Sequence, residues 1–125
     1  MESTILVCDN EEVLRGLVSA SLEGNGYTLV EARDGDEAVE QARLIRPDLI
    51  LLDMMMPGQT GLEVLAELRG DPGLRDIPVV MLTARAQVTD REAARLAGAD
   101  SFLAKPFSPL ELAGVVKELL GNGRP

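Results

Sequence analysis

Short apolar runs alternate along the chain with segments in which apolar residues recur at helical spacing. The runs of strand length lie at residues 4–8, 27–32, 49–52, 77–82 and 101–104. Helical periodicity predicts five helices. Four of them lie at residues 11–23, 61–69, 87–97 and 109–120, and the fifth begins at Asp34-Gly35 and is ended by Pro47. This alternation predicts an α/β fold with a parallel sheet, right-handed crossovers and helices on both faces of the sheet.

The segment 11–23 shows the helical pattern clearly. Its apolar residues, which we place on one inner face, are Val13, Leu14, Leu17, Val18 and Leu22. Asp9 and Asn10 precede the segment, and either residue can serve as its N-cap. By contrast, residues 49–52 are apolar without alternation, which is typical of a strand covered on both faces.

The length of 125 residues predicts one domain. We expect residues 1–120 to form this domain and residues 121–125 to be a frayed tail or the stub of a linker. The three consecutive methionines at 54–56 are expected to pack in a loop.

Composition narrows the possible functions. Twelve basic residues against 21 acidic residues give a net charge of −9, which argues against nucleic-acid binding by this domain. The chain has no histidine and a single cysteine, Cys8, so it cannot supply a Ser-His-Asp or Cys-His triad, a Cys/His zinc cluster or an intrachain disulfide. No apolar run approaches the ~20 residues that a membrane span requires. We expect a soluble, cytoplasmic protein that does not insert into membranes.

Polar residues directly follow four of the five predicted strands. They are Asp9 and Asn10 after the first strand, Asp53 after the third, Thr83 after the fourth and Lys105 after the fifth. The second strand ends in Glu31 and Arg33, which we interpret as a solvated edge. Because open parallel sheets bind ligands at the carboxyl ends of their strands, these side chains are expected to converge. Each alone is explained as a turn, cap or surface residue, but together they favour a site for a divalent cation and a phosphoryl group.

Five motifs in the chain resemble those of the response-regulator receiver domains (CheY-like). They are Ile-Leu-Val-Cys-Asp-Asn-Glu at 5–11, Pro-Asp-Leu-Ile-Leu-Leu-Asp at 47–53, Met-Pro-Gly and Gly-Leu-Glu at 56–58 and 61–63, Met-Leu-Thr-Ala at 81–84, and Lys-Pro-Phe at 105–107. Each motif is weak alone, but all five occur in order and at the family's spacing. The resemblance extends from Ile5 to Leu120 and implies a flavodoxin-like (βα)5 fold with strand order 2-1-3-4-5.

The resemblance also implies a function. Asp53 would accept a phosphoryl group from a sensor histidine kinase or a histidine phosphotransfer protein, with Mg²⁺ as the cofactor. The implied metal ligands are Asp9, Asn10, Asp53 and the backbone carbonyl of Met55. Thr83 would bond one phosphoryl oxygen through its hydroxyl, and Lys105 would pair with another.

A conformational switch is implied as well. Phosphorylation would draw Thr83 inward, and Phe102, at the family's aromatic switch position, would rotate into the space left. The surface formed by residues 87–97, 101–104 and 109–120 would then change shape for a downstream protein that the sequence does not identify. Because Phe102 has no hydroxyl, its readout would depend on shape alone. The Lys105–Pro106 bond would be cis.

Other classes of function stay open from the residues themselves. A non-phosphorylated interaction module with the same fold is favoured only by Asn10, which stands where the family usually has an acidic residue. A flavodoxin-type flavin binder is disfavoured because residues 9–12, Asp-Asn-Glu-Glu, would repel a phosphate. An aspartate-nucleophile phosphatase normally has a second acid two residues after the first, where Met55 stands. We therefore expect no enzyme beyond catalysis of the chain's own phosphorylation and dephosphorylation.

The amide at position 10 generates a prediction about the cation. It can ligate through its oxygen, but it removes one negative charge from the site. We predict weaker Mg²⁺ affinity, and therefore slower phosphorylation, in this chain than in its Asn10→Asp variant. Titration of both proteins with Mg²⁺ checks this, and equal affinities would contradict it.

Overall fold

Five parallel strands form one sheet in this computed structural model, which describes residues 3–83 and 88–120 and, for residues 88–91, the backbone alone. The strands are β1 (Ser3–Cys8), β2 (Tyr27–Ala32), β3 (Leu49–Asp53), β4 (Val79–Thr83) and β5 (Ser101–Ala104). Their order is β2-β1-β3-β4-β5, and every neighbouring pair is parallel. The predicted α/β class and strand order are therefore confirmed. The predicted tail at 121–125 lies outside the described residues.

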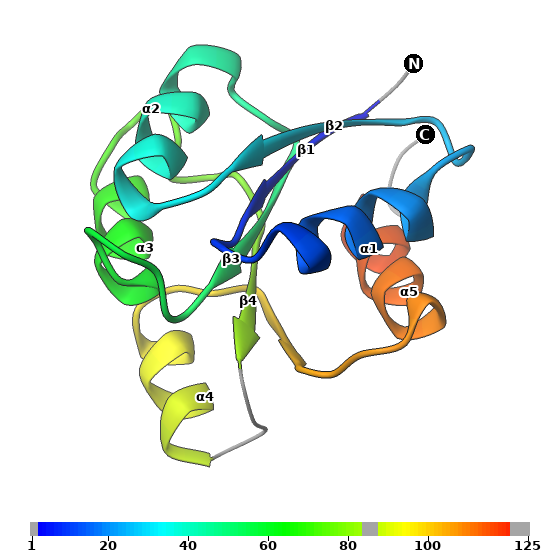
Figure 1. Cartoon of the computed structure of the whole chain (residues 1–125). Coiled ribbons are helices and arrows are strands. Elements are labelled where there is room, and N and C mark those ends of the chain that lie inside the picture. Colours follow the sequence, from blue (N-terminus) through cyan, green and yellow to red (C-terminus); the bar gives the residue numbers. More distant parts are fainter. Residues whose placement is uncertain (1–2, 84–87, 121–125) are drawn as a thin grey trace.

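Helices cover both faces of this sheet (Figure 1). They are α1 (Glu12–Leu22), α2 (Gly35–Ile45), α3 (Gly61–Arg69), α4 (Val88–Leu96) and α5 (Pro109–Leu120). Helices α1 and α5 contact each other on one face, while α2, α3 and α4 lie on the other. Among the described helices, none has the length and apolar character needed to cross a bilayer.

The strands supply a hydrophobic core to each face. In β1, Ile5 and Val7 join the core under α1 and α5, while Leu6 and Cys8 join the core under α2 and α3. All residues of β3 and β4 are buried, which explains why the sequence at these strands is continuously apolar up to Asp53 and Thr83. Burial of each such aliphatic side chain contributes about 1.5–3 kcal/mol to the stability of the fold. This packing holds the strand ends in fixed positions.

The inner face of α1 differs from the one predicted. Val13 is 86% exposed and Leu17 is 39% exposed, whereas Arg15, Val18 and Leu22 are buried. The buried positions are three and four residues apart, the spacing of a single helical face. Val13 lies about 200° around the helix from Arg15 and therefore faces away from the sheet. The prediction was wrong here because it excluded a charged residue from the buried face.

The N-cap of α1 and the start of β4 also differ from the prediction, and other boundaries shift by one residue. The N-cap of α1 is Glu11, and the Asp9 carboxylate accepts a hydrogen bond from its backbone N–H at 2.9 Å before the helix begins. Strand β4 begins at Val79 and not at Ile77. The N–H of Ile77 donates to Leu74 O at 3.1 Å in the preceding turn, and Pro78 has no N–H to give.

A close backbone approach between β3 and α3 generates a prediction about stability. A Cβ on Gly61 would collide with the carbonyl oxygen of Asp53 and lie 2.8 Å from Met54 Cα. Because both atoms are backbone, Gly61→Ala must shift the end of β3, and we expect it to lower the free energy of unfolding by about 1–3 kcal/mol. Urea denaturation measures this.

The exposed Gly16 of α1 provides the control. A Cβ there meets nothing within 4 Å, so Gly16→Ala is expected to raise the free energy of unfolding by about 0.5–1 kcal/mol. Equal stability of Gly61→Ala and the wild type would contradict the steric interpretation.

Candidate functional site

Four of the predicted site residues meet at the carboxyl edge of the sheet. Asp9 and Lys105 directly follow β1 and β5, while Asp53 and Thr83 are the last residues of β3 and β4. Asp9, Asp53 and Thr83 are buried, at 0%, 5% and 1% exposure. Polar side chains at such depth need partners, and the contacts of Lys105 supply them for both carboxylates.

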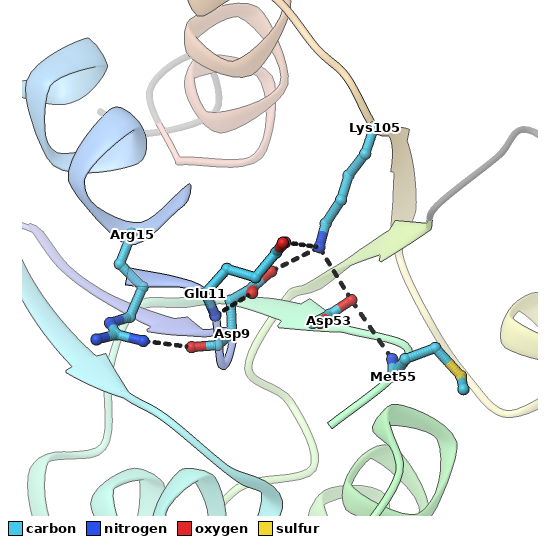
Figure 2. Close-up of polar contacts among 6 residues, drawn as sticks. All are labelled: Asp9, Glu11, Arg15, Asp53, Met55 and Lys105. Carbon is cyan, nitrogen blue, oxygen red and sulfur yellow. Dashed lines mark hydrogen bonds and ion pairs between the residues drawn. The ribbon is translucent and has the colours of Figure 1, made fainter. Parts of the chain in front are cut away.

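The Lys105 ammonium is the centre of this cluster (Figure 2). Its Nζ lies 2.7 Å from Asp9 Oδ2 and 3.3 Å from Asp53 Oδ1, and Glu11 Oε1 is 3.5 Å away. The backbone N–H of Lys105 donates to the carbonyl of Thr83 at 2.7 Å. One residue therefore links the ends of β1, β3 and β4. The Lys105–Pro106 bond is cis, as the resemblance implies.

Backbone groups hold the two carboxylates in place. Asp53 Oδ1 accepts a hydrogen bond from the N–H of Met55 at 3.4 Å, and Asp9 Oδ1 accepts one from the N–H of Glu11 at 2.9 Å. The N–H of Asp9 in turn donates to Ala32 O, at the end of β2, at 3.0 Å. Both acids are thus fixed by the chain segments that follow their own strands.

Burial and the neighbouring charges both act on the pKa of Asp53. Burial raises this pKa above its ordinary value, and the Asp9 carboxylate raises it further, while Lys105 and the N–H of Met55 oppose the shift. Burial by itself would lower the pKa of Lys105, but its hydrogen bond to Asp9 and the two carboxylate charges outweigh burial and raise it. The ammonium is therefore charged at neutral pH and only partly compensates the acids.

The hydroxyl of Thr83 has hydrogen-bonding capacity to spare. Its Oγ1 is buried and has no hydrogen-bond partner within the described part of the chain. An unsatisfied buried hydroxyl is costly unless a ligand pairs with it. Thr83 is therefore suited to donate to an oxygen of a bound group at this edge.

Asn10 and Met55 lie at the mouth of the site. Asn10 is exposed, and the Met55 side chain is 71% exposed, so the expectation of methionine packing in this loop fails at position 55. Met56 is buried, and Met54 packs against the core. A shallow cleft of about 690 Å³ opens between α1 and the loops after β3 and β5; its lining residues are Asn10, Glu11, Leu14, Asp53, Met55, Lys105 and Pro106.

Phe102 does not belong to the charged cluster. It pairs with Met81 in the β4–β5 ladder and packs, partly buried, against the core under α2, α3 and α4. The structure thus separates this residue from the ion pairs, although the sequence places it only three residues before Lys105.

The oxygen ligands at this edge suit a hard cation. Among the side chains that the structure describes, at residues 3–83 and 92–120, no three from His, Cys, Asp or Glu gather into a metal-binding group. Mg²⁺ needs fewer: it is commonly held by one or two carboxylates and keeps several waters. The paired carboxylates of Asp9 and Asp53, with the amide of Asn10 and the loop at Met55 beside them, fit this requirement.

Sequence reasoning missed two neighbours of the cluster. Glu11 contacts Lys105, and the guanidinium of Arg15 donates to the backbone carbonyl of Asp9 at 2.8 Å. Arg15 also pairs with Glu31, at 2.7 Å, so the end of β2 is not merely a solvated edge. The signal for Arg15 was its place three residues before Val18 and seven before Leu22, on the apolar face of α1.

Comparison with known sequences assigns the chain to a family. Residues 5–117 match the response regulator receiver domain. The phosphate regulon transcriptional regulatory protein PhoB of Escherichia coli is 46% identical over 120 residues, which are 96% of this chain and 52% of PhoB. The chain thus spans about half the length of the curated relatives that it matches.

Solved structures agree with this assignment. The chemotaxis response regulator CheY4 of Vibrio cholerae superposes with a TM-score of 0.91 at 31% identity, over 96% of this chain and all of CheY4. The receiver domain of the sensor histidine kinase PA1611 from Pseudomonas aeruginosa, which has a magnesium ion coordinated in its active-site cleft, gives a TM-score of 0.89 at 33% identity, over 98% of this chain and all of that domain. With its sequence, strand order and fold in agreement, this chain belongs to the response regulator receiver domains of two-component systems.

Proposed function

We propose that this receiver domain carries a phosphoryl group on Asp53, transferred from the phosphohistidine of a sensor histidine kinase or a histidine phosphotransfer protein. The supporting observation is the arrangement at the carboxyl edge of the sheet. The Lys105 ammonium contacts the carboxylates of Asp9 and Asp53, and the buried hydroxyl of Thr83 stands at the end of the next strand. These side chains offer a carboxylate acceptor, a positive charge and a hydroxyl donor for a phosphoryl group.

The proposed transfer makes one bond and breaks one. A carboxylate oxygen of Asp53 forms a bond to phosphorus while the bond from phosphorus to the donor histidine breaks, and the histidine nitrogen keeps the electron pair. In dephosphorylation, the oxygen of a water molecule forms a bond to phosphorus while the bond from phosphorus to the Asp53 oxygen breaks. The carboxylate keeps the electron pair, the water gives up a proton to solvent, and inorganic phosphate is released. The nucleophile is fixed before the reaction, because Lys105 and the N–H of Met55 already orient Asp53 Oδ1.

The surrounding residues stabilise the charge that develops. The long, flexible side chain of Lys105 can follow a phosphoryl oxygen while its charge stays in the cluster. The Thr83 hydroxyl, which pairs with no described group, donates to a second phosphoryl oxygen. The proposed metal ligands are Asp9, Asn10, Asp53 and the carbonyl of Met55. When bound there, Mg²⁺ supplies positive charge that screens the carboxylates and the phosphoryl group. The magnesium ion of the PA1611 receiver domain supports this choice of metal.

The readout that we propose begins at Thr83. A hydrogen bond to the phosphoryl group draws this residue toward Asp53, and Phe102 adjusts its packing without a hydroxyl of its own. The surface of α4, β5 and α5 then changes for a downstream protein. The transcriptional regulator PhoB is similar to this chain over only half its length. The proposed function therefore ends at this surface and includes no activity in transcription.

Phosphoryl transfer to Asp53 is tested with a small donor. Incubation with acetyl phosphate and Mg²⁺ is expected to add one phosphoryl group, seen by intact mass, and Asp53→Asn is expected to abolish the gain. Asp36→Asn, which replaces an exposed aspartate at the start of α2, is the matched control and should be labelled like the wild type. Failure of both acetyl phosphate and a phosphorylated kinase to label the wild type would favour a non-phosphorylated interaction module.

The raised pKa of Asp53 predicts a pH-dependent change in stability. Because the folded-state pKa lies above the unfolded one, the stabilisation from the protonated carboxyl is complete below the unfolded pKa and is lost as pH rises through the folded pKa. Ionised Asp53 therefore costs stability at neutral pH. In chelator-containing buffer, Asp53→Asn is expected to raise the free energy of unfolding at pH 7, and the gain should narrow as pH falls toward 3.8.

Asp71→Asn is the control, and we expect it to change the free energy of unfolding in the opposite direction. The N–H of Gly73 lowers the pKa of Asp71, so its charged form stabilises the fold. This variant should lose stability at neutral pH in the same denaturation series. A loss of stability in Asp53→Asn as well would contradict the electrostatic interpretation of the site.

A further inference from the structure

Arg15 is a buried charge that the proposed chemistry does not use. Four polar side chains are buried within the described part of the chain: Asp9, Arg15, Asp53 and Thr83. Three of them belong to the carboxyl edge of the sheet, whereas Arg15 comes from α1 and is 7% exposed. A buried guanidinium is costly unless it is paired and hydrogen-bonded, so its contacts are informative.

The guanidinium connects α1 with the ends of β1 and β2, and Figure 2 shows its contact after β1. Its Nη1 donates to the backbone carbonyl of Asp9 at 2.8 Å, just after β1. Its Nε donates to Glu31 Oε1, on β2, at 2.7 Å. The Glu31 carboxylate is about half exposed and neutralises the guanidinium charge. Glu31 thereby anchors Arg15, and Arg15 holds the Asp9 carbonyl.

That carbonyl belongs to the peptide group that joins Asp9 to Asn10. The preceding peptide is held through the Asp9 N–H, which donates to Ala32 O at 3.0 Å. Both peptide groups of Asp9 are therefore fixed, one by β2 and the other by Arg15. The orientation of the second peptide sets the position and direction of the Asn10 Cα–Cβ bond. The planar guanidinium of an arginine is suited to bind a carbonyl and a carboxylate at the same time.

We propose that Arg15, anchored by Glu31, is a positioning residue that holds the Asp9-Asn10 segment in the conformation required for divalent-cation binding. This inference rests on the metal site of the proposed function. Among the contacts drawn in Figure 2, Arg15 reaches Asp9 and neither Asp53 nor Lys105. It acts on cation affinity through the backbone between two proposed ligands.

The sign of the effect separates positioning from simple electrostatics. Removal of a positive charge near a cation site would by itself tighten cation binding. Loss of a positioning contact would weaken it, because the freed segment must be ordered when the ion binds. Arg15→Met, which keeps an unbranched apolar stem, therefore gives opposite results under the two interpretations.

The experiment measures Mg²⁺ affinity directly by isothermal titration calorimetry at fixed ionic strength. Replacement of residues that orient metal ligands typically lowers metal affinity by 10- to 100-fold, and we expect Arg15→Met to raise the Mg²⁺ Kd by about tenfold. The labelling rate with acetyl phosphate should recover to within about twofold of the wild type at saturating Mg²⁺. Glu31→Gln and Arg15→Lys, which retain part of the arrangement, should give intermediate Kd values.

Arg69→Met is the matched control. Arg69 also donates to a backbone carbonyl, that of Gly98 at 3.0 Å, and pairs with Asp100 at 2.9 Å, but these contacts lie before β5, at the opposite edge of the sheet. Its loss should lower the melting temperature and leave the Mg²⁺ Kd unchanged. Thermal unfolding identifies any variant that fails to fold, in which case Arg15→Lys carries the test.

The outcomes separate this inference from the proposed function. An unchanged or lower Kd in Arg15→Met overturns the positioning role, as does an equal rise in Arg69→Met. Mg²⁺ binding by the wild type without labelling of Asp53 would contradict the phosphoryl transfer, while the calorimetric test of Arg15 still decides the inference. A wild type that binds no Mg²⁺ overturns both the metal site and the role of Arg15.

Discussion

The Lys105 ammonium holds two buried carboxylates at one end of the sheet against their mutual repulsion. Asp9 and Asp53 are each nearly inaccessible to water, and one positive charge only partly compensates them. Burial raises the pKa of Asp53, and the neighbouring Asp9 carboxylate raises it further, against the opposing effect of Lys105. Additional positive charge at this edge would relieve the repulsion, and a cation bound there would in turn favour an anionic group beside it. The charge balance thus connects the proposed metal binding with the proposed phosphoryl transfer.

The fold provides the rigidity that this balance requires. Buried strands of continuous apolar sequence carry Asp53 and Thr83 at their ends, and the close approach of Gly61 seats α3 directly against the end of β3. Around Asp9 the support comes from hydrogen bonds. The Asp9 N–H donates to the carbonyl of Ala32, and the Asp9 carbonyl accepts from the guanidinium of Arg15. Apolar packing therefore fixes the position of the strands, and hydrogen bonds fix the direction of the peptide groups that follow them.

Most of the architecture could be predicted from the sequence because each element has a clear periodicity. Fully apolar segments correctly indicated the central strands β3 and β4, although the start of β4 depended on a turn in which Ile77 bonds back to Leu74. The inner face of α1 was predicted with Val13 included and Arg15 excluded. Hydrophobicity alone cannot reveal that a charged residue is buried when its partners come from β1 and β2.

The sequence by itself determined the alternation of strands and helices and the polar residues at the ends of four of the five strands, because both follow from local spacing. Its motifs, through the family that they resemble, also indicated the strand order. Only the tertiary structure decided which atoms meet: that Lys105 lies between Asp9 and Asp53, that no described group pairs with the buried Thr83 hydroxyl, and that Arg15 reaches the Asp9 carbonyl. These contacts join segments up to 96 residues apart, and their distances depend on how the packed helices and strands place each side chain in three dimensions.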